Sequence, residues 1–519
     1  MVLVLSGRCV PCDSDDPDAV FDGRVFITND GLIEKITKGS AVAPAGFGAA
    51  PVLNAGDGFI TPGLIDLHNH IGYNTLPLWA EPKQTVPFAH HDNWTRAPSY
   101  GPSISWPANT LVNTEPEAFL AYVQLRALVG GTTAIQGWPG ANRKHVQVLR
   151  NIDEGPDRSG SNNLYSTSTL TLKGEALAKK AQAQKNGQGF IYHCGEGSVN
   201  SLVRREFVDA SQAGCLQKNF ICIHCNSITR DDWQFWPTER AGAIVWSPFS
   251  NLWLYGSTTD ITAARGQGIL VCIGSDWGPS GTKNVQGEVK AARLASEKFG
   301  FGLSDRDLFA MITSNPGDAL ARVWNKVSGR LVEGGLADVT IMRARGKISA
   351  QNSAFKQLVL STEDDVMLTV VEGIARYGDA GLLAQQLAVP SANFTLGGRE
   401  RRFAIPEPGN DNNAWELANF TDLLKAVIAN PAKAISKAQA RMLSFTGGFD
   451  EPDAPLLLKL DMPSGGTAFA ASLNNLKKHV NKIVVPPLAS LVHDKSFFGD
   501  IKGRGFHDGL LDKLKGFYQ

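Results

Sequence analysis

The sequence has no excess charge of either sign, no long apolar run and no basic leader. Its 50 basic and 50 acidic residues cancel to a formal net charge of zero over 519 residues, which argues against a nucleic-acid partner and against an anionic membrane surface. It contains no uninterrupted stretch of about 20 apolar residues, which a membrane-spanning helix requires. The apolar run at its start is too short for a secretory signal. The sequence therefore predicts a cytoplasmic protein that acts on a small-molecule substrate, with no nucleic-acid or membrane partner.

Cysteine is also scarce. The seven cysteines form an odd set, and most of them lie in or beside apolar strand-like runs, where a free thiol behaves as a small apolar group. Cys9 and Cys12 form one C-x-x-C, but no second pair follows at zinc-site spacing. We expect neither a disulfide framework nor a metal site at this pair.

The middle of the chain alternates strand-like and helix-like segments. Strands are expected at residues 59–66, 132–136, 163–170, 190–193, 220–224, 243–247 and 269–275, and helices at residues 115–129 and 175–185. This alternation predicts an α/β protein whose parallel strands form a (β/α)8 TIM-like barrel. Seven strands are evident, the eighth is expected between residues 145 and 170, and a doubly wound sheet is the alternative.

The flanks of this segment read differently. Short β-rich pieces separated by Gly, Asp and Asn turns precede it and predict a small antiparallel sheet, which similar strands after residue 326 could complete. The expected domains are therefore residues 1–60 and 326–382 as two parts of one small β-sandwich, 61–325 as the barrel, and 383–519 as an extension of unknown role. In that extension one amphipathic helix is expected from the helical spacing of Phe420, Leu423, Leu424, Val427 and Ile428.

Four of the ten histidines fall at or just past the ends of expected strands, namely His68, His70, His193 and His224. Barrel enzymes assemble their active sites at this end of the strands. In an extended segment residues 68 and 70 point the same way, so two imidazoles reach one ion. His193 is the expected third ligand, and Glu196, three residues later, is placed to lie over the metal rather than on it.

Six motifs resemble the amidohydrolase superfamily, in the branch of the triazine hydrolases and the cytosine, guanine and S-adenosylhomocysteine deaminases. The resemblance covers residues 1 to about 380. The motifs are residues 61–70 (TPGLIDLHNH), 193–196 (HCGE), His224 with Cys225, 247–251 (SPFSN), 274–276 (GSD) and 331–338 (LVEGGLAD).

The resemblance implies one divalent metal ion, zinc or iron(II), bound by His68, His70, His193 and Asp276. It gives catalytic roles to Glu196, His224 and Asp276. A bound ion lowers the pKa of water from about 15.7 to about 7, after which Asp276 takes the proton, His224 orients the nucleophile and Glu196 protonates the leaving nitrogen. That last role requires a raised pKa for Glu196.

Lys173 raises an alternative, because binuclear relatives place a carboxylated lysine on their fourth strand. A second metal ion would then be expected. Lys173 precedes Gly174 and a lysine-rich helix, which favours a solvated position and a mononuclear site.

A long insertion between His70 and Leu111 is expected to cover the pocket, because it far exceeds the usual connection of about 2 to 6 residues. Its aromatic residues, and others after strand ends, favour a flat or apolar substrate. The candidate substrate contacts are Trp79, Trp94, Trp106, Trp138 and Trp277. His90 and His91 form a loop pair that is expected at the surface.

The leading hypothesis is a metal-dependent hydrolase that cleaves a C–N bond, by deamination of an aromatic heterocycle or by amide hydrolysis. Displacement of another leaving group, C–Cl or C–S, on an electron-poor ring is the second hypothesis, and a non-catalytic barrel used for binding is the third. In the C-terminal tail, Phe497 and Phe498 are interpreted as exposed, and the tail packs against the lid or across a subunit interface. Relatives commonly form assemblies, so a homo-oligomer is one option.

Overall fold

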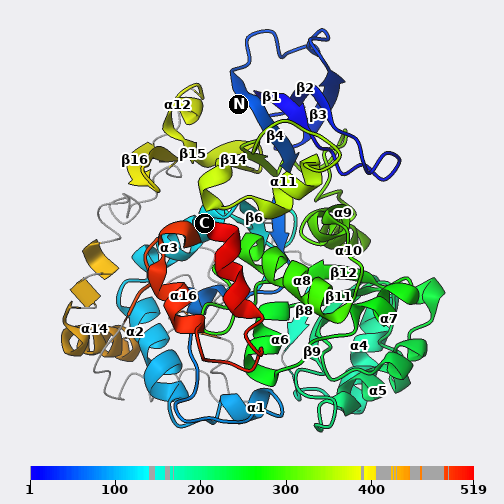
Figure 1. Ribbon diagram of the computed structural model, residues 1–519, viewed down its shortest axis with the longest axis vertical. Coiled ribbons are helices and arrows are strands. Elements are labelled where there is room, and N and C mark those ends of the chain that lie inside the picture. The colour runs from blue at the N-terminus through cyan, green and yellow to red at the C-terminus, as the bar shows by residue number, and fades with distance from the viewer. Residues whose placement is uncertain are drawn as a thin grey trace.

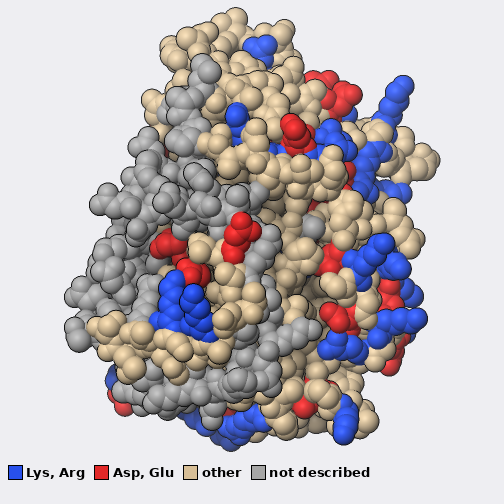
Figure 2. Space-filling view, turned by 90° about the vertical axis from the view of Figure 1, so that its left-hand side faces the viewer, with Lys and Arg blue, Asp and Glu red and all other residues tan. Residues whose placement is uncertain are grey.

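The computed structural model describes residues 2–138, 146–157, 164–167, 169–386, 391–404, 422–424, 426–427, 429–444, 456, 458, 484–488 and 490–519. Within these residues no helix combines the length and the apolar character that a membrane span needs. On the face that Figure 2 draws, acidic and basic side chains lie interspersed, as expected for a chain without net charge.

A nine-stranded sheet forms the upper part of the molecule in Figure 1 and is built from both flanks of the chain, in the order β16-β17-β15-β14-β13-β4-β1-β2-β3. The strands are β1 (Leu3–Cys9), β2 (Phe21–Ile27), β3 (Ile33–Lys38), β4 (Val52–Pro62), β13 (Val339–Met342), β14 (Val366–Val371), β15 (Ile374–Asp379), β16 (Ser391–Leu396) and β17 (Arg399–Ala404). The sheet is not purely antiparallel as expected for the N-terminal part, because β1 and β4 run parallel. β4 joins the two flanks through its antiparallel pairing with β13.

Parallel strands follow in two groups, β5-β6-β7 and β8-β9-β10-β11-β12. They are β5 (Leu64–Asp66), β6 (Thr132–Ile135), β7 (Arg150–Asn151), β8 (Leu164–Thr167), β9 (Gly189–Cys194), β10 (Phe220–His224), β11 (Ala243–Trp246) and β12 (Leu270–Ile273). β7 lies between residues 145 and 170, where an eighth strand was expected although the sequence pattern did not locate it. The expected strand at residues 59–66 is divided, because β4 ends at Pro62 on β13 whereas β5 pairs with β6.

Helices separate the parallel strands and cover them (Figure 1). They are α3 (Pro116–Val129), α4 (Glu175–Lys185), α5 (Arg204–Gln212), α6 (Pro248–Tyr255), α7 (Ile261–Gly266), α8 (Val285–Phe299), α9 (Asp305–Ala310) and α10 (Ser314–Trp324). The expected helices at residues 115–129 and 175–185 are confirmed as α3 and α4. An apolar cluster joins alternate residues of β5, β9, β10, β11 and β12, among them Ile65, Ile191, Ile221, Ile223, Val245 and Cys272.

The insertion after β5 contains η1 (Ile71–Tyr73), α1 (His91–Trp94), a π-helical turn η2 (Gly101–Ser105) and α2 (Trp106–Thr114). Outside it lie η3 (Arg230–Phe235), η4 (Thr238–Arg240), α11 (Ala354–Leu360), η5 (Glu363–Asp365), α12 (Ala380–Leu383) and α14 (Pro431–Ser444). Of the amphipathic pattern expected in the extension, Leu424 and Val427 are helical and buried, while Phe420 and Ile428 lie outside the described residues.

The C-terminal tail returns to the parallel strands through η8 (Leu491–His493), α16 (Lys495–Ile501) and η9 (Leu511–Tyr518). In Figure 1 the red terminal segment lies beside α8 and α6. Phe497 is buried against Phe249, with ring centroids 6.0 Å apart, so its interpretation as an exposed residue was wrong. Its partner lies on α6, far away in the sequence, and no local pattern marks that contact.

Candidate metal centre

The ends of parallel strands from both groups bring four histidines and the carboxylates of Glu196 and Asp276 close together. His68 and His70 follow β5, His193 lies on β9, His224 ends β10, and Asp276 follows β12. The segments after β5 and β12 are joined by a parallel bridge between Asn69 and Asp276. Backbone hydrogen bonds hold this bridge, from the Asp276 N–H to the His68 carbonyl (3.0 Å) and from the His70 N–H to the Asp276 carbonyl (2.7 Å).

The expected ligand atoms lie close together. His68 Nε2 is 3.2 Å and His70 Nε2 is 3.7 Å from Asp276 Oδ1, and His193 Nε2 is 3.4 Å from His70 Nε2. Ligand atoms of a tetrahedral zinc site with bonds of about 2.0 to 2.1 Å are about 3.3 Å apart. The spacing of these side chains therefore fits a small divalent ion.

Electrostatics support the same conclusion. Burial lowers the pKa of His68 to about 3 and holds the pKa of His70 well below its ordinary value, so the rings are neutral and keep lone pairs for an ion. Both ring nitrogens of His68 are buried. Gln136 lies within reach of the ring, and Nε2 faces Asp276 Oδ1 at 3.2 Å with no hydrogen bond between them. A buried nitrogen without a partner is costly, and ligation of a cation by these residues satisfies it.

A neighbouring network supports the ligands. Asp66 accepts hydrogen bonds from the Ser275 N–H and the Asn69 side chain, each at 3.0 Å, and from the Ser275 hydroxyl. These bonds tie the segment after β5 to the segment after β12, one residue away from the ligands on either side. The network therefore fixes the spacing of His68, His70 and Asp276.

His224 is held in one tautomer. Asn251 Oδ1 lies 3.2 Å from His224 Nδ1, and the Asn251 amide nitrogen faces the Thr259 hydroxyl, which donates to the His224 carbonyl. The oxygen of Asn251 therefore accepts from Nδ1–H, and Nε2 is left with its lone pair. Nε2 faces Glu196 Oε2 at 3.8 Å.

Glu196 is buried beside the histidines with its two carboxyl oxygens in different surroundings. Oε1 accepts from the Tyr255 hydroxyl at 2.7 Å, whereas Oε2 has no partner among the described residues. Burial, reinforced by the negative charge of Asp276, raises the pKa of Glu196 to about 7. The carboxyl is therefore protonated in a substantial fraction of molecules at neutral pH.

Backbone strain gathers at the same strand ends. His224, Cys225 and Asp276 adopt φ values of 65°, 57° and 62°, in the left-handed region that costs a non-glycine residue on the order of 1 to 3 kcal/mol. Such strain persists where surrounding contacts impose it, and here the turns direct His224 and Asp276 toward one point.

The insertion docks on the segment that carries Glu196. His90 forms an antiparallel bridge with Gly197, and the His91 N–H donates to the Glu196 carbonyl at 3.2 Å. A Cβ at Gly197 would lie 2.4 Å from the Ala89 carbonyl oxygen, so only glycine permits this approach.

This docking reveals a histidine whose position the sequence did not suggest. His91 is buried rather than at the surface, its Nδ1 faces Asp92 at 3.2 Å, and Nε2 has no partner among the described residues. The surface interpretation was wrong for His91, because a backbone bridge, which leaves no sequence pattern, anchors the loop. Tyr255, which contacts Glu196, was also missed, since its place at the end of α6 reads as ordinary core.

The expected aromatic contacts divide into two groups. Trp94 and Trp277 lie 5.1 Å apart, and Trp277 also contacts His70 at 6.5 Å between ring centroids, so these two form a wall beside the ligands. Trp79 packs within the insertion against Phe88. Trp106 begins α2, and Trp138 is buried, with its backbone N–H donating to Asp153 Oδ2.

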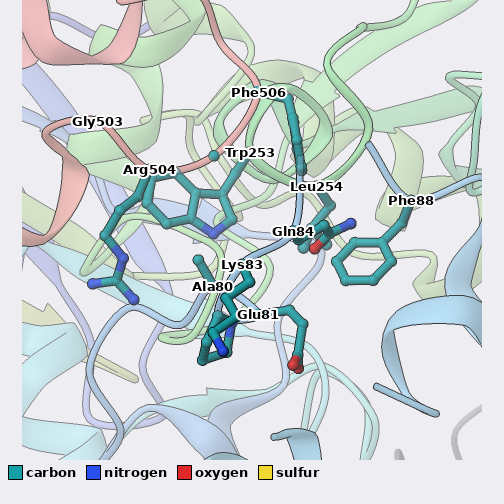
Figure 3. A pocket seen from close by; sticks show the side chains of 12 residues that line it. Ala80, Glu81, Lys83, Gln84, Phe88, Trp253, Leu254, Gly503, Arg504 and Phe506 are labelled. Atoms are coloured by element: carbon teal, nitrogen blue, oxygen red, sulfur yellow. The ribbon is translucent and has the colours of Figure 1, made fainter. Parts of the chain in front are cut away.

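The tail, the insertion and the end of α6 line a separate pocket (Figure 3). It has a volume of about 370 Å³ and lies between the insertion, the end of α6 and residues 503–506 of the tail. Trp253 closes it, held by a hydrogen bond to the Trp79 carbonyl and by stacking on His507. The C-terminal tail thus packs against the insertion, one of the two places expected for it.

Two other motifs lie away from the centre. Lys173 is exposed and precedes α4, in the solvated position favoured by the sequence. All seven cysteines are free and buried, including Cys9 and Cys12.

Known proteins resemble this chain in both sequence and fold. A 5-methylthioadenosine/S-adenosylhomocysteine deaminase from Caldicellulosiruptor saccharolyticus is 25% identical over 418 residues, covering 74% of this chain and 95% of the relative. Escherichia coli guanine deaminase superposes with a TM-score of 0.54 at 17% identity, covering 73% of this chain and 99% of that one. An atrazine chlorohydrolase from Arthrobacter aurescens, complexed with zinc and atraton, has a TM-score of 0.55 at 16% identity and covers 72% and 94%.

No protein-family model matches the chain. The chain is an α/β protein with the fold of these enzymes, and its clustered histidines and carboxylate could hold a metal ion. Together with the deaminase sequence relative, these features make the chain similar to the deaminase branch of the amidohydrolase superfamily.

Proposed function

We propose that the chain is a metal-dependent hydrolase that cleaves a C–N bond of an aromatic or heterocyclic small molecule, by deamination or by amide hydrolysis. The observation that carries this proposal is the combination of neutral, buried imidazoles with a buried carboxyl group whose pKa is raised to about 7. The imidazoles bind an ion, and the carboxyl group of Glu196 supplies a proton. The names of the related deaminases point to the same reaction class.

His68, His70, His193 and Asp276 are the proposed ligands of one divalent ion, zinc or iron(II). When bound, the ion lowers the pKa of water and polarises the substrate. The spacing of the ligand atoms, and a buried His68 Nε2 that faces Asp276 without a hydrogen bond, support this ligand set. The zinc in the related chlorohydrolase structure favours zinc.

The remaining steps belong to side chains of the protein. His224 accepts a hydrogen bond from the attacking water at Nε2 and orients it, and Asp276 takes one proton from that water. A bond forms between the water oxygen and the substrate carbon, and the C–N bond breaks with its electron pair remaining on nitrogen. Glu196 protonates that nitrogen, and ammonia or an amine leaves.

The wall of Trp94 and Trp277 is the proposed seat for a flat substrate ring. His91 lies at the same side, on the segment that docks beside Glu196, and its free Nε2 is a candidate partner for a polar substituent of the substrate. Trp79, Trp106 and Trp138 are proposed to line the outer part of the substrate path.

We further propose that the parallel strands close into a (β/α)8 barrel within residues 61–325. The bridge between Asn69 and Asp276 joins the ends of the first and last strands, and the shared apolar cluster lies where a barrel interior would be. Residues 1–60 and 326–382 are proposed as one β-sandwich domain around the pairing of β4 with β13. Residues 383–519 form the extension, whose strands β16 and β17 add to the edge of the same nine-stranded sheet.

A panel of aminated heterocycles and aryl amides, assayed for release of ammonia or amine by the purified metal-loaded protein, tests the function. We expect release from at least one class and none from the Glu196→Gln variant. Release of chloride or thiol from a parallel set of substituted rings, with no ammonia or amine, would replace the C–N assignment by the second hypothesis. Absence of any release would favour a binding protein.

A further inference from the structure

A buried hydrogen-bond chain connects the insertion to the proposed proton donor. Trp94 of α1 donates from Nε1 to the Tyr255 hydroxyl oxygen at 2.9 Å, and the Tyr255 hydroxyl bonds Glu196 Oε1 at 2.7 Å. All three side chains are buried. Tyr255 is 161 positions from Trp94 and 59 positions from Glu196 in the sequence.

The chemistry of the donors fixes the direction of both hydrogen bonds. An indole nitrogen only donates, so the oxygen of Tyr255 must accept from Trp94. A phenol has a single proton, and the remaining partner of the hydroxyl is Glu196 Oε1. Tyr255 therefore donates to Oε1, and Oε1 acts as an acceptor whether Glu196 is ionised or protonated.

This direction distinguishes the two oxygens of Glu196. With Oε1 committed as an acceptor, a proton on the carboxyl group resides on Oε2. Oε2 has no partner among the described residues and lies 3.8 Å from His224 Nε2, so it faces the reacting groups.

We propose that Tyr255 is a positioning residue that keeps the transferable proton of Glu196 on Oε2, and that Trp94 acts through Tyr255 by fixing the direction of its hydroxyl. The inference rests on the proposed role of Glu196 and deepens it. It also gives the insertion a part in the chemistry, since Trp94 orients the acid only while α1 is docked beside Glu196.

Kinetics of single and double variants test whether Trp94 and Tyr255 act on Glu196 as a unit. In Tyr255→Phe we expect kcat to fall roughly 10- to 100-fold, because the carboxyl loses its fixed orientation, while KM changes by less than about threefold and metal content is unchanged. Trp94→Phe should show a smaller fall. The double variant should lose no more kcat than Tyr255→Phe alone, because Trp94 reaches Glu196 only through the Tyr255 hydroxyl. The place of Trp94 in the substrate wall should appear separately, as a rise in KM.

Tyr377→Phe is the matched control, since Tyr377 lies on β15 and its buried hydroxyl has no partner among the described residues. It should keep the kcat of the unaltered protein. Additive losses in the double variant, or an unchanged kcat in Tyr255→Phe, would overturn the proposal.

Infrared difference spectra provide a measurement that needs no substrate. At about pH 5, where carboxyl groups with raised pKa values are protonated, the C=O stretch that disappears in Glu196→Gln belongs to Glu196. Loss of the bond from Tyr255 should raise its frequency in Tyr255→Phe, and Tyr377→Phe should leave it unchanged. If this shift occurs while no C–N substrate is found, the proposed reaction fails and the positioning role stands, whereas an unshifted band overturns the positioning role.

Discussion

The strand ends and the insertion meet at the metal centre, but different kinds of contact hold them. The strand ends are fixed by backbone ladders, by the Asp66 network and by strained turns at His224 and Asp276. The insertion approaches through a backbone bridge at Gly197, through single backbone hydrogen bonds such as that from Phe88 to Leu254, and through side chains such as Trp94. We infer that the strand ends supply a preorganised ligand set and that the insertion adjusts the acid and the substrate seat.

The largest effect is expected at the strand ends, from Glu196→Gln. Loss of a general acid should lower kcat/KM by roughly 10² to 10⁴-fold, while metal content stays unchanged because Glu196 is not among the proposed ligands. Glutamine still accepts from Tyr255, so the fold should persist. Steady-state kinetics with metal analysis of the same sample check this, and full activity would remove Glu196 from the mechanism.

A smaller effect is expected from disturbing the insertion with Gly197→Ala. The added Cβ would lie 2.4 Å from the Ala89 carbonyl oxygen, so the insertion must shift. We expect KM to rise and kcat to fall, so that kcat/KM falls roughly tenfold. Metal content should be retained.

Gly266→Ala on α7 is the control for that variant, because a Cβ there has no neighbour within 4 Å. Its kinetics should match those of the unaltered protein. Loss of metal in Gly197→Ala would contradict the proposed division between a rigid ligand set and an adjustable insertion.

The smallest effect on activity, but a clear one on stability, is expected from Glu288→Gln on α8. Burial raises the pKa of Glu288 from 4.5 to about 8. The Thr282 hydroxyl faces both Asn284 O and Glu288 Oε2 at 2.8 Å. It has one proton, so when it donates to Asn284 O the second contact is a hydrogen bond only if a protonated Glu288 donates to the hydroxyl oxygen.

Because the folded state binds this proton more tightly than the unfolded state, the stabilisation is complete below pH 4.5 and is lost as the pH rises through about 8. Glu288→Gln should remove that decline, on the order of a few kcal/mol. Urea unfolding of both proteins at pH 5 and pH 8 measures it. A decline of equal size in the variant would assign the pH dependence to other groups.

The clustering of the proposed ligands could be predicted from the sequence, because each of them ends or follows an apolar strand and parallel strands align their ends. His68, His70, His193, His224 and Asp276 all lie where that argument expects them. Their catalytic roles remain proposals.

Strand β7 and the contacts between the insertion and Glu196 could not be predicted in the same way. β7 has only two residues and so carries no periodic pattern. The burial of His91 depends on a bridge to Gly197, and the role of Tyr255 depends on a partner 59 positions away. Contacts of this kind arise from the folded arrangement of distant segments, and no local spacing encodes them.

The central claim is a single metal ion held by the strand ends, and elemental analysis of the purified protein tests it most directly. We predict close to one divalent ion per chain, its loss in His68→Ala, and loss of hydrolysis on chelation with recovery when zinc or iron(II) is restored. Two ions per chain would contradict the mononuclear site, and full hydrolysis by metal-free protein would contradict the mechanism.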